Sequence, residues 1–291
     1  NHFPTQWTDY MKKGVPILCA ENVEEVTEKV QGTYKGTRTT PYEALKAECQ
    51  RYGYTTSYKI LDNGKLGGKV ARKRTIMQAQ SAEIREHWSQ PIGDSKEKQL
   101  TRLEKQLIQL GMAHTHYIED GFVWPMEQPP TAEQNIENVL LTWDEVKQRF
   151  GNRYFMNTEM WEDFIAEIQT YDGSVRILHR QDASLGSPNF PNIVLDVKGL
   201  ARSITALGNT RWILDPDSKY LRARLLTPLE SLSLMGFTGR HRIPEDEISE
   251  ETAKEIAGNA VPVEMATKIL AVVNVLAMVS IFGMANLLVV L

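Results

Sequence analysis

Two stretches near the C-terminal end decide the fold of this chain. Leu226–Phe237 has the sequence L-T-P-L-E-S-L-S-L-M-G-F, and Gly258–Pro262 has the sequence G-N-A-V-P. The first predicts a helix, because Thr227 can cap it, Pro228 suits its first turn, and Glu230 completes a capping box with the threonine. The second predicts a new helix that starts about a turn after its glycine.

Apolar residues and a glycine complete the pattern of the first helix. Leu229, Leu232 and Met235 form an apolar stripe, and Gly236 ends the helix. With Arg224 in front, the two stretches resemble the last two conserved blocks of the cytosine-5 DNA methyltransferases. Those blocks are roughly R-x-L-T-P-x-E-x-x-x-L-x-G-F and G-N-A/S-V-x-P, so the match holds at many fixed spacings.

Members of this family also carry a Glu-Asn-Val block at the end of a buried strand. This chain has two such tripeptides, at Glu21–Val23 and Glu137–Val139. Only the first follows a short apolar run, Val15–Ala20, which predicts a strand buried in a parallel sheet. The second lies in a polar stretch that leads to a capping box at Thr142. We therefore take Glu21 as the functional residue and Glu137 as a solvated coincidence.

The resemblance extends to a third block, G-x-P-Q-x-R-x-R in the family and G-G-K-V-A-R-K-R at Gly67–Arg74 here. Lys69 and Val70 replace the proline and glutamine, whereas Arg72 and Arg74 keep their places. Without its flanks this segment would indicate only a solvated basic edge strand. The flanks predict a helix from about Thr40 to Tyr52, a strand at Thr55–Leu61 and a partner strand at Lys73–Gln80.

The resemblance implies roles for these residues. In the family, a cysteine thiolate attacks C6 of a cytosine flipped out of the DNA, and a carboxyl relieves negative charge at N3. That carboxyl would be Glu21, with Arg74 at the O2 side of the base and Arg72 at a neighbouring phosphate. Asn259 and Ala260 would border the S-adenosylmethionine site.

The family's F-x-G-x-G cofactor block and Pro-Cys nucleophile block do not precede Glu21, so we expect a fragment or a processed piece. The chain has two cysteines. Cys19 lies inside the apolar run, and Cys49 shares a helix face with Leu45 and Tyr52, so both are predicted to be core thiols. Without metal-ligand spacing they indicate a reducing compartment, and we expect no metal site.

The C-terminal segment Ala271–Leu291 has no charged residue and qualifies as a transmembrane candidate. The competing prediction is a buried helix and strand, because Val279–Leu287 resembles a degraded form of the family's first block, V-S-L-F-x-G-I-G-x-L. In circularly permuted members, such as the plant domains-rearranged class, that block directly follows the Gly-Asn-x-Val block. We favour the permuted, truncated enzyme, which adds Phe282 and Gly283 to the cofactor site.

The middle of the chain carries no catalytic signature. Amphipathic helices are predicted at Ser95–Gly111 and Thr158–Gln169, and short strands at Val175–Leu178, Ile193–Val197, Ser203–Ala206 and Trp212–Leu214. In the family this region is the target recognition domain. The resemblance therefore makes four residues candidates for phosphates or guanine edges, although each alone would be an ordinary surface charge: Arg176, Arg180, Arg202 and Arg211. Arg202 is favoured because Arg202–Thr205 resembles a turn of the family.

The resemblance implies an α/β fold, part of a Rossmann-like methyltransferase sheet with an inserted small α+β target recognition domain. We expect portions of the catalytic domain at 1–80 and 216–270, the target recognition region at 81–215 and an apolar tail at 271–291, the possible start of a permuted cofactor-binding strand. The chain is long enough for an ample core at 291 residues. Its formal net charge of −4 counts against non-specific DNA binding.

The predicted function is that of a cytosine-5 DNA methyltransferase fragment acting with S-adenosylmethionine on double-stranded DNA. Its partner would be the missing half of the catalytic domain, in the same chain or a second subunit, and the isolated chain would be inactive. Two alternatives remain: an inactive DNA-binding or regulatory module derived from the family, and a protein tethered to a membrane by its tail. The family's chemistry implies an intracellular location with DNA, in the nucleus of a eukaryote.

Overall fold

The computed structural model describes residues 3–30, 32–34, 36–92, 100–158, 162, 169–171, 177–179, 193–204, 212–214, 223–237 and 249–277. Packing divides the chain into two compact units. The first unit is formed by Asn1–Asp62, Lys73–Gln128 and Met265–Leu291, and the second by Asn63–Arg72 and Pro129–Glu264. Each unit has its own sheet and core, and each is described separately.

The first unit is built on β1 (Ile17–Asn22), β4 (Tyr54–Asp62) and β6 (Lys73–Ser81), in the order β1-β6-β4. Both outer strands pair antiparallel with β6, so β1 and β4 run in the same direction. The predicted hairpin at Thr55–Leu61 and Lys73–Gln80 is therefore confirmed. β6, the described neighbour of β1, pairs with it antiparallel, so the prediction of a parallel sheet around β1 is wrong for this pair. Burial on both faces made the run apolar, and burial does not fix strand direction.

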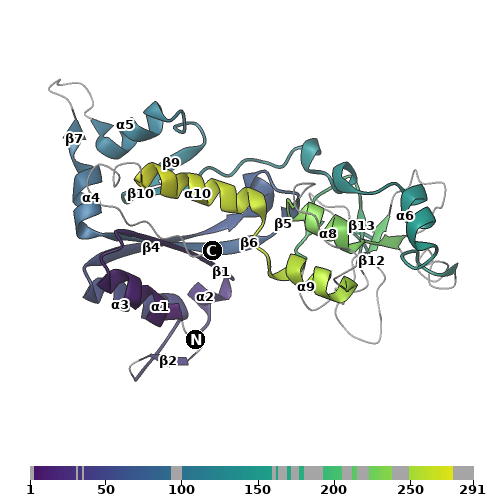
Figure 1. Cartoon of the computed structure of the whole chain (residues 1–291), viewed down its shortest axis with the longest axis horizontal. Helices are drawn as coiled ribbons and strands as arrows, with labels where there is room; N and C mark the ends of the chain where they lie inside the picture. The colour runs from purple at the N-terminus through teal and green to yellow at the C-terminus, as the bar shows by residue number, and fades with distance from the viewer. Residues whose placement is uncertain are drawn as a thin grey trace. The chain divides into compact units, whose positions relative to one another are not determined.

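Side chains alternate between the two faces of this sheet, and each face is covered (Figure 1). One face packs against α1 (Phe3–Lys12) and α3 (Pro41–Arg51), with Trp7, Leu45 and Met77 in the core. The other packs against α4 (Ala82–Ser89), α5 (Arg102–Gln109) and α10 (Val263–Ala277), through residues such as Trp88 and Val272. As predicted, Thr40 caps α3 by accepting a hydrogen bond from the Glu43 N–H.

The remaining described elements of the first unit are short. They are α2 (Glu25–Glu28), β2 (Gly32–Tyr34), β3 (Thr37–Thr39), β7 (Pro91–Ile92), β8 (Leu100–Thr101), β9 (His116–Glu119) and β10 (Phe122–Pro125). Pairs β2–β3, β7–β8 and β9–β10 are antiparallel.

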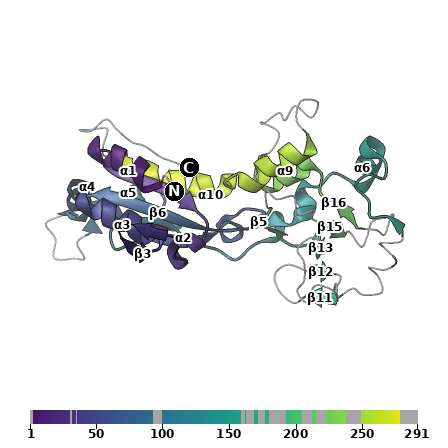
Figure 2. The same ribbon diagram turned by 90° about the horizontal axis from the view of Figure 1, so that it is seen from below.

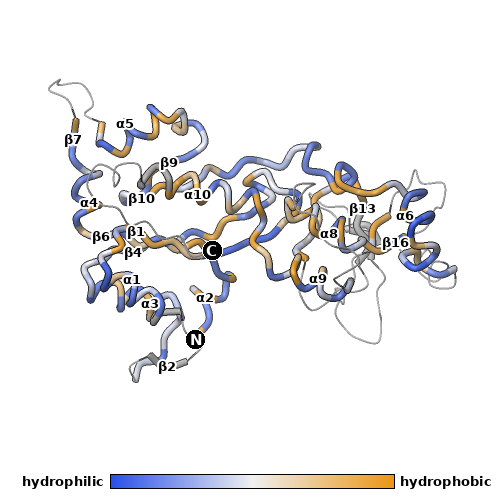
Figure 3. Tube along the Cα trace, in the orientation of Figure 1, coloured by the Kyte–Doolittle hydropathy of each residue, from blue (hydrophilic) through white to orange (hydrophobic). Residues whose placement is uncertain are grey.

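The helix predicted from Ser95 begins later in the structure. A capping box of Thr101 and Glu104 starts α5 at Arg102, and Leu100 belongs to β8. Leu103 and Leu107 are buried, as their spacing predicts, and hydrophilic and hydrophobic residues alternate along α5 in Figure 3. The stronger local signal, a threonine followed by a glutamate at the capping distance, sets the helix start.

The second unit contains a five-stranded sheet in the order β11-β12-β13-β15-β16, visible in Figure 2. Its strands are β11 (Gln169–Tyr171), β12 (Ile177–His179), β13 (Ile193–Asp196), β15 (Trp212–Leu214) and β16 (Arg224–Leu225). Only β13 and β15 pair in parallel. Three of the predicted strands correspond to β12, β13 and β15. Gln169 opens a strand, and most of the helix predicted at Thr158–Gln169 lies outside the described residues.

Other elements of this unit are η1 (Asn63–Leu66), β5 (Val70–Ala71), η2 (Ala132–Gln134), η3 (Ile136–Val139), α6 (Trp143–Phe150), β14 (Ala201–Arg202), α8 (Pro228–Leu234) and α9 (Glu250–Asn259). The short strands β5 and β14 pair in parallel. Capping boxes start α6 at Thr142 and α8 at Thr227, as predicted, and Gly236 follows α8 with a φ of +89°.

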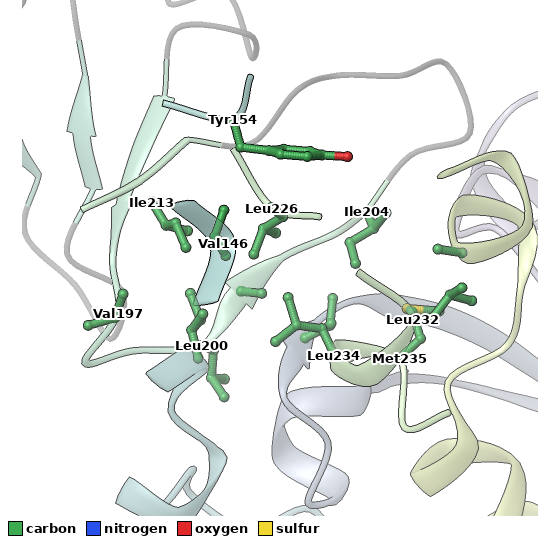
Figure 4. Packing of buried hydrophobic residues seen from close by; sticks show 14 of the residues in the cluster. Val146, Tyr154, Val197, Leu200, Ile204, Ile213, Leu226, Leu232, Leu234 and Met235 are labelled. Atoms are coloured by element: carbon green, nitrogen blue, oxygen red, sulfur yellow. The ribbon is translucent and has the colours of Figure 1, made fainter. Parts of the chain in front are cut away.

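The core of the second unit is one cluster, and its side chains converge in Figure 4. It joins Val146 of α6, Ile213 of β15 and Leu232 of α8 with Tyr154 and Met235. Leu234 is buried as well, so α8 is covered on more than the predicted stripe.

The compact units divide the chain at different places from the predicted functional portions. Residues 82–92 and 100–128 pack in the first unit, where they cover a face of the β1-β6-β4 sheet. Helices α8 and α9 join the core of the second unit. The division into catalytic portions and a recognition region stays a prediction.

Among the described residues, one helical stretch, Glu251–Val273, is apolar and long enough to cross a membrane, with mean hydropathy 1.4. Its C-terminal part is core in the structure, since Met265, Ile269, Val272 and Val273 are buried. A buried core helix passes the same test of length and composition. Of the apolar tail, residues up to Ala277 are the end of α10, and the predicted strand beyond lies outside the described residues.

Candidate active site

Glu21 lies where β1 leaves the core. The preceding residues Ile17–Ala20 are at most 2% exposed, and the Glu21 side chain is 16% exposed. The next residue, Asn22, ends the strand, and its Oδ1 accepts a hydrogen bond from the Val23 N–H at 2.8 Å. The apolar run thus holds a carboxyl at the border between core and solvent.

Arg74 meets Glu21 on the same face of the sheet. The register pairs Glu21 with Ile76, so Arg74, two residues earlier on β6, is its diagonal neighbour. The Arg74 Nε lies 2.7 Å from the Glu21 Oε1, and the arginine side chain is 17% exposed. Arg74 Nη1 also donates to the Lys73 carbonyl at 2.7 Å. The two side chains assigned to the cytosine from sequence are brought together as a charge-assisted, partly accessible pair.

Arg72, predicted to contact a phosphate, is held by contacts within the protein in this structure. It is 4% exposed, and its guanidinium donates to the Ile204 carbonyl from Nη1 and to the Gly258 carbonyl from Nη2, both at 2.8 Å. Arg72 lies between β5 and β6 rather than inside a strand, so it does not share the face of Arg74. Both Nη atoms are therefore engaged inside the second unit, away from solvent.

Side-chain amides hold the segment in which Lys69 and Val70 replace the family's Pro-Gln. Gln134 Nε2 donates to the Gly64 and Gly68 carbonyls, both at 2.6 Å, and Asn63 Nδ2 donates to the Val70 carbonyl at 2.9 Å. A Cβ at Gly68 would overlap the Asn63 amide, so a larger residue there would displace this amide and disturb its hydrogen bond to the Val70 carbonyl. The sequence prediction missed Gln134, because a glutamine in a polar stretch carries no local signal.

A buried ion pair anchors the start of α8. Arg224 Nη2 lies 2.6 Å from Glu230 Oε1 and Nη1 lies 2.9 Å from Oε2, with side chains 0% and 1% exposed. The Arg224 Cζ also lies 4.1 Å from the centre of the Trp143 ring. Both charged residues were singled out from sequence, but their pairing was not predicted.

Comparison with known families decides what these elements belong to. The family model of C-5 cytosine-specific DNA methylase matches residues 11–274. The chain belongs to this family. The resemblance noted in the sequence is thereby confirmed, and it covers both units.

Solved structures support the fold of this family member. One is a mutant of Spodoptera frugiperda DNMT2, with a TM-score of 0.53 and 12% identity over 92% of this chain and 70% of that one. Another is the Entamoeba histolytica methyltransferase EhMeth, with a TM-score of 0.52 and 10% identity over 96% and 69%. These likenesses confirm the predicted α/β class. Comparison with curated protein sequences gives no match.

Within this methylase the second Glu-Asn-Val copy has a different setting. Glu137 is exposed in η3, and its carboxylate accepts a hydrogen bond from Asn135 Nδ2 at 3.2 Å. It is not at the end of a buried strand. The structure therefore gives Glu137 the solvated position expected from sequence.

The residues expected at the cofactor site are described in part. Asn259 is exposed at the end of α9, so its amide is available to a ligand, and the half-buried Ala260 donates its N–H to the Ile256 carbonyl. Phe282 and Gly283 lie outside the described residues. The place of Asn259 and Ala260 at an S-adenosylmethionine site stays a prediction.

The DNA-binding arginines stay predictions. Arg202 ends β14, which pairs with β5 inside the family's third block. Arg176, Arg180 and Arg211 lie outside the described residues. No group of three or more metal-ligating side chains occurs in the parts of the chain that the structure describes.

Neither cysteine is placed to act as the nucleophile. Cys19 is 2% exposed in β1 and Cys49 is 0% exposed in α3, and both thiols are free. Burial raises the pKa of Cys19 to about 12, and burial together with the neighbouring Glu48 carboxylate raises the pKa of Cys49 to about 12. A catalytic thiol needs the opposite shift.

We expect the native chain to resist alkylation by iodoacetamide at pH 8. With these pKa values, the reactive thiolate is about one part in 10⁴ of each cysteine at that pH. Intact-mass spectrometry should show no adduct on the native chain and two adducts in denaturant. Rapid labelling of either residue in the native chain would contradict its assignment as a core thiol.

Proposed function

We propose that this chain supplies the cytosine-binding and DNA-recognition parts of a cytosine-5 DNA methyltransferase, and that the nucleophilic cysteine comes from outside these 291 residues. The observation that carries the proposal is the Glu21–Arg74 pair, 2.7 Å apart at the end of β1. The family match and the α/β fold support the reaction class.

The pair is suited to a pyrimidine edge. Attack of a thiolate at C6 pushes negative charge toward N3 and O2 of the ring, and C5 becomes nucleophilic as this charge is stabilised. The Glu21 carboxyl can hydrogen-bond or protonate N3, and the Arg74 guanidinium can donate to O2. Their partial exposure leaves both groups accessible to a base flipped from the stack.

The remaining components are assigned as follows. S-adenosylmethionine supplies the methyl group in the family's reaction, and Asn259 is the described side chain that would border it. The nucleophile must be a different cysteine, because Cys19 and Cys49 are buried with pKa values raised to about 12. A partner segment with the Pro-Cys and F-x-G-x-G blocks would complete the catalytic domain.

The burial of both cysteines also favours a second candidate, a DNA-binding module of the family without turnover. Such a module would keep the predicted target recognition region and bind double-stranded DNA. The two candidates differ in whether a complementing segment restores methyl transfer.

The test begins with the coding sequence on either side of this segment. A Pro-Cys block downstream would fit a permuted enzyme, and one upstream would fit the ordinary order. Co-purification of that segment with this chain is expected to give methyl transfer from labelled S-adenosylmethionine to cytosine in duplex DNA, with neither part active alone. The control replaces the cysteine of the Pro-Cys block by serine, which should abolish transfer. Binding of duplex without transfer, in the complete assembly, would support the module instead.

A further inference from the structure

Arg72, in the family's third block, makes contacts that its predicted role at a phosphate does not explain. Its guanidinium is buried and donates to two carbonyls from widely separated segments, Ile204 and Gly258, at 2.8 Å each. The planar fork of an arginine can reach two acceptors at once with fixed geometry, whereas a lysine offers a single point charge.

Each carbonyl belongs to an element expected to have a function. Ile204 follows β14, whose last residue is Arg202, in the stretch whose sequence resembles a turn of the family. Ser203 Oγ of this stretch donates to the Ala71 carbonyl at 3.0 Å. Gly258 lies in the last turn of α9, next to Asn259. The last carbonyls of a helix have no partner within the helix and favour a positive charge. Arg72 therefore serves as a cap on α9 while it holds the segment that follows β14.

We propose that Arg72 is a positioning residue that fixes the DNA-recognition turn and the cofactor-side helix end in one arrangement. The proposal rests on the proposed function for the roles of Arg202 and Asn259, whereas the linkage itself rests on the two hydrogen bonds. Because one guanidinium holds both segments, ordering of the turn by DNA is transmitted to the end of α9.

The decisive variant is Arg72→Lys, which keeps the charge and removes the fork. Backbone hydrogen exchange in residues 199–204 and 253–260 is expected to accelerate about tenfold or more, since loss of a charge-assisted hydrogen bond is of that order. Exchange in β9 and β10 should be unchanged. Lys73→Met, which alters the exposed neighbour, is the matched control and should leave both segments as in the wild type. Unchanged exchange in both segments of Arg72→Lys would overturn the proposal.

Two measurements with duplex DNA separate positioning from a phosphate contact. In the wild type, DNA is expected to protect residues 253–260 from exchange, and Arg72→Lys should lose this protection. In Arg72→Met, affinity should fall with an unchanged slope of log K against log salt, whereas loss of a phosphate contact would reduce the slope by about 0.9. A reduced slope, or protection retained in Arg72→Lys, would count against positioning.

The experiments distinguish failure of the proposed function from failure of the positioning role of Arg72. If the wild-type chain does not bind duplex DNA, the proposed function is wrong for this chain, while the exchange comparison without DNA still decides whether Arg72 holds both segments. Should Arg72→Met not fold, the Lys variant supplies both exchange measurements, because its charge is retained.

Discussion

Glu21→Gln is expected to lower methyl transfer by roughly 10²–10⁴-fold in the enzyme completed with its Pro-Cys segment, the range typical of a positioned general acid. The amide keeps the size of the side chain but cannot give a proton to N3, and it weakens the 2.7 Å ion pair with Arg74. Single-turnover measurements with duplex DNA should place the loss in the chemical step, with little change in DNA affinity.

The second Glu-Asn-Val copy gives the matched control. Glu137→Gln makes the same chemical change at an exposed site, so transfer should remain close to the wild-type rate. Arg74→Gln should resemble Glu21→Gln, because it removes the other member of the pair. If Glu137→Gln lost activity and Glu21→Gln did not, Glu137 would be the functional carboxyl. The candidate site would then lie in the second unit.

The features predicted well from sequence are those with local physical signals. An apolar run before Glu21 predicted β1, and the threonine–glutamate spacings at Thr142 and Thr227 predicted the starts of α6 and α8. Strand alternation also brought Arg74 to the side of Glu21. Such signals act within one strand or one helical turn, so they can be recognised without the rest of the fold.

The contacts of Arg72 could not be predicted from local sequence patterns. Alternate residues share a face only inside a continuous strand, but β5 ends at Ala71 and β6 begins at Lys73, so Arg72 belongs to neither strand. Its acceptors, Ile204 and Gly258, are far along the sequence, as Gln134 is from the glycine carbonyls it binds. The unit boundaries depend on the same long-range packing. No local pattern encodes these contacts.

The buried pair of Arg224 and Glu230 gives the largest expected effect on stability. Four donors converge on the Glu230 carboxylate: the two Arg224 Nη atoms at 2.6 and 2.9 Å, the Thr227 N–H at 2.7 Å and the Leu141 N–H at 2.9 Å. Arg224 in turn donates to the Leu141 carbonyl at 3.1 Å. The pair therefore joins the start of α8 to the segment that leads into α6.

Glu230→Gln leaves the Arg224 charge buried without its counter-charge, and removing one partner of such a pair costs about 3–5 kcal/mol. We expect the urea midpoint to fall accordingly at an unchanged m value. Glu145→Gln is the matched control, because Glu145 occupies the same capping-box position at α6 but is exposed. Its effect should be a small fraction of the Glu230 effect.

A double-mutant cycle with Arg224→Met separates the pair from the cap. If the charges act as a unit, Arg224→Met in the Glu230→Gln background should cost much less than it does in the wild type, with a coupling of about 0.5–3 kcal/mol. Additive losses would show that Glu230 acts through the Thr227 and Leu141 amides alone. Equal losses in Glu145→Gln and Glu230→Gln would lead to the same conclusion, because the cap is the feature that the two glutamates share.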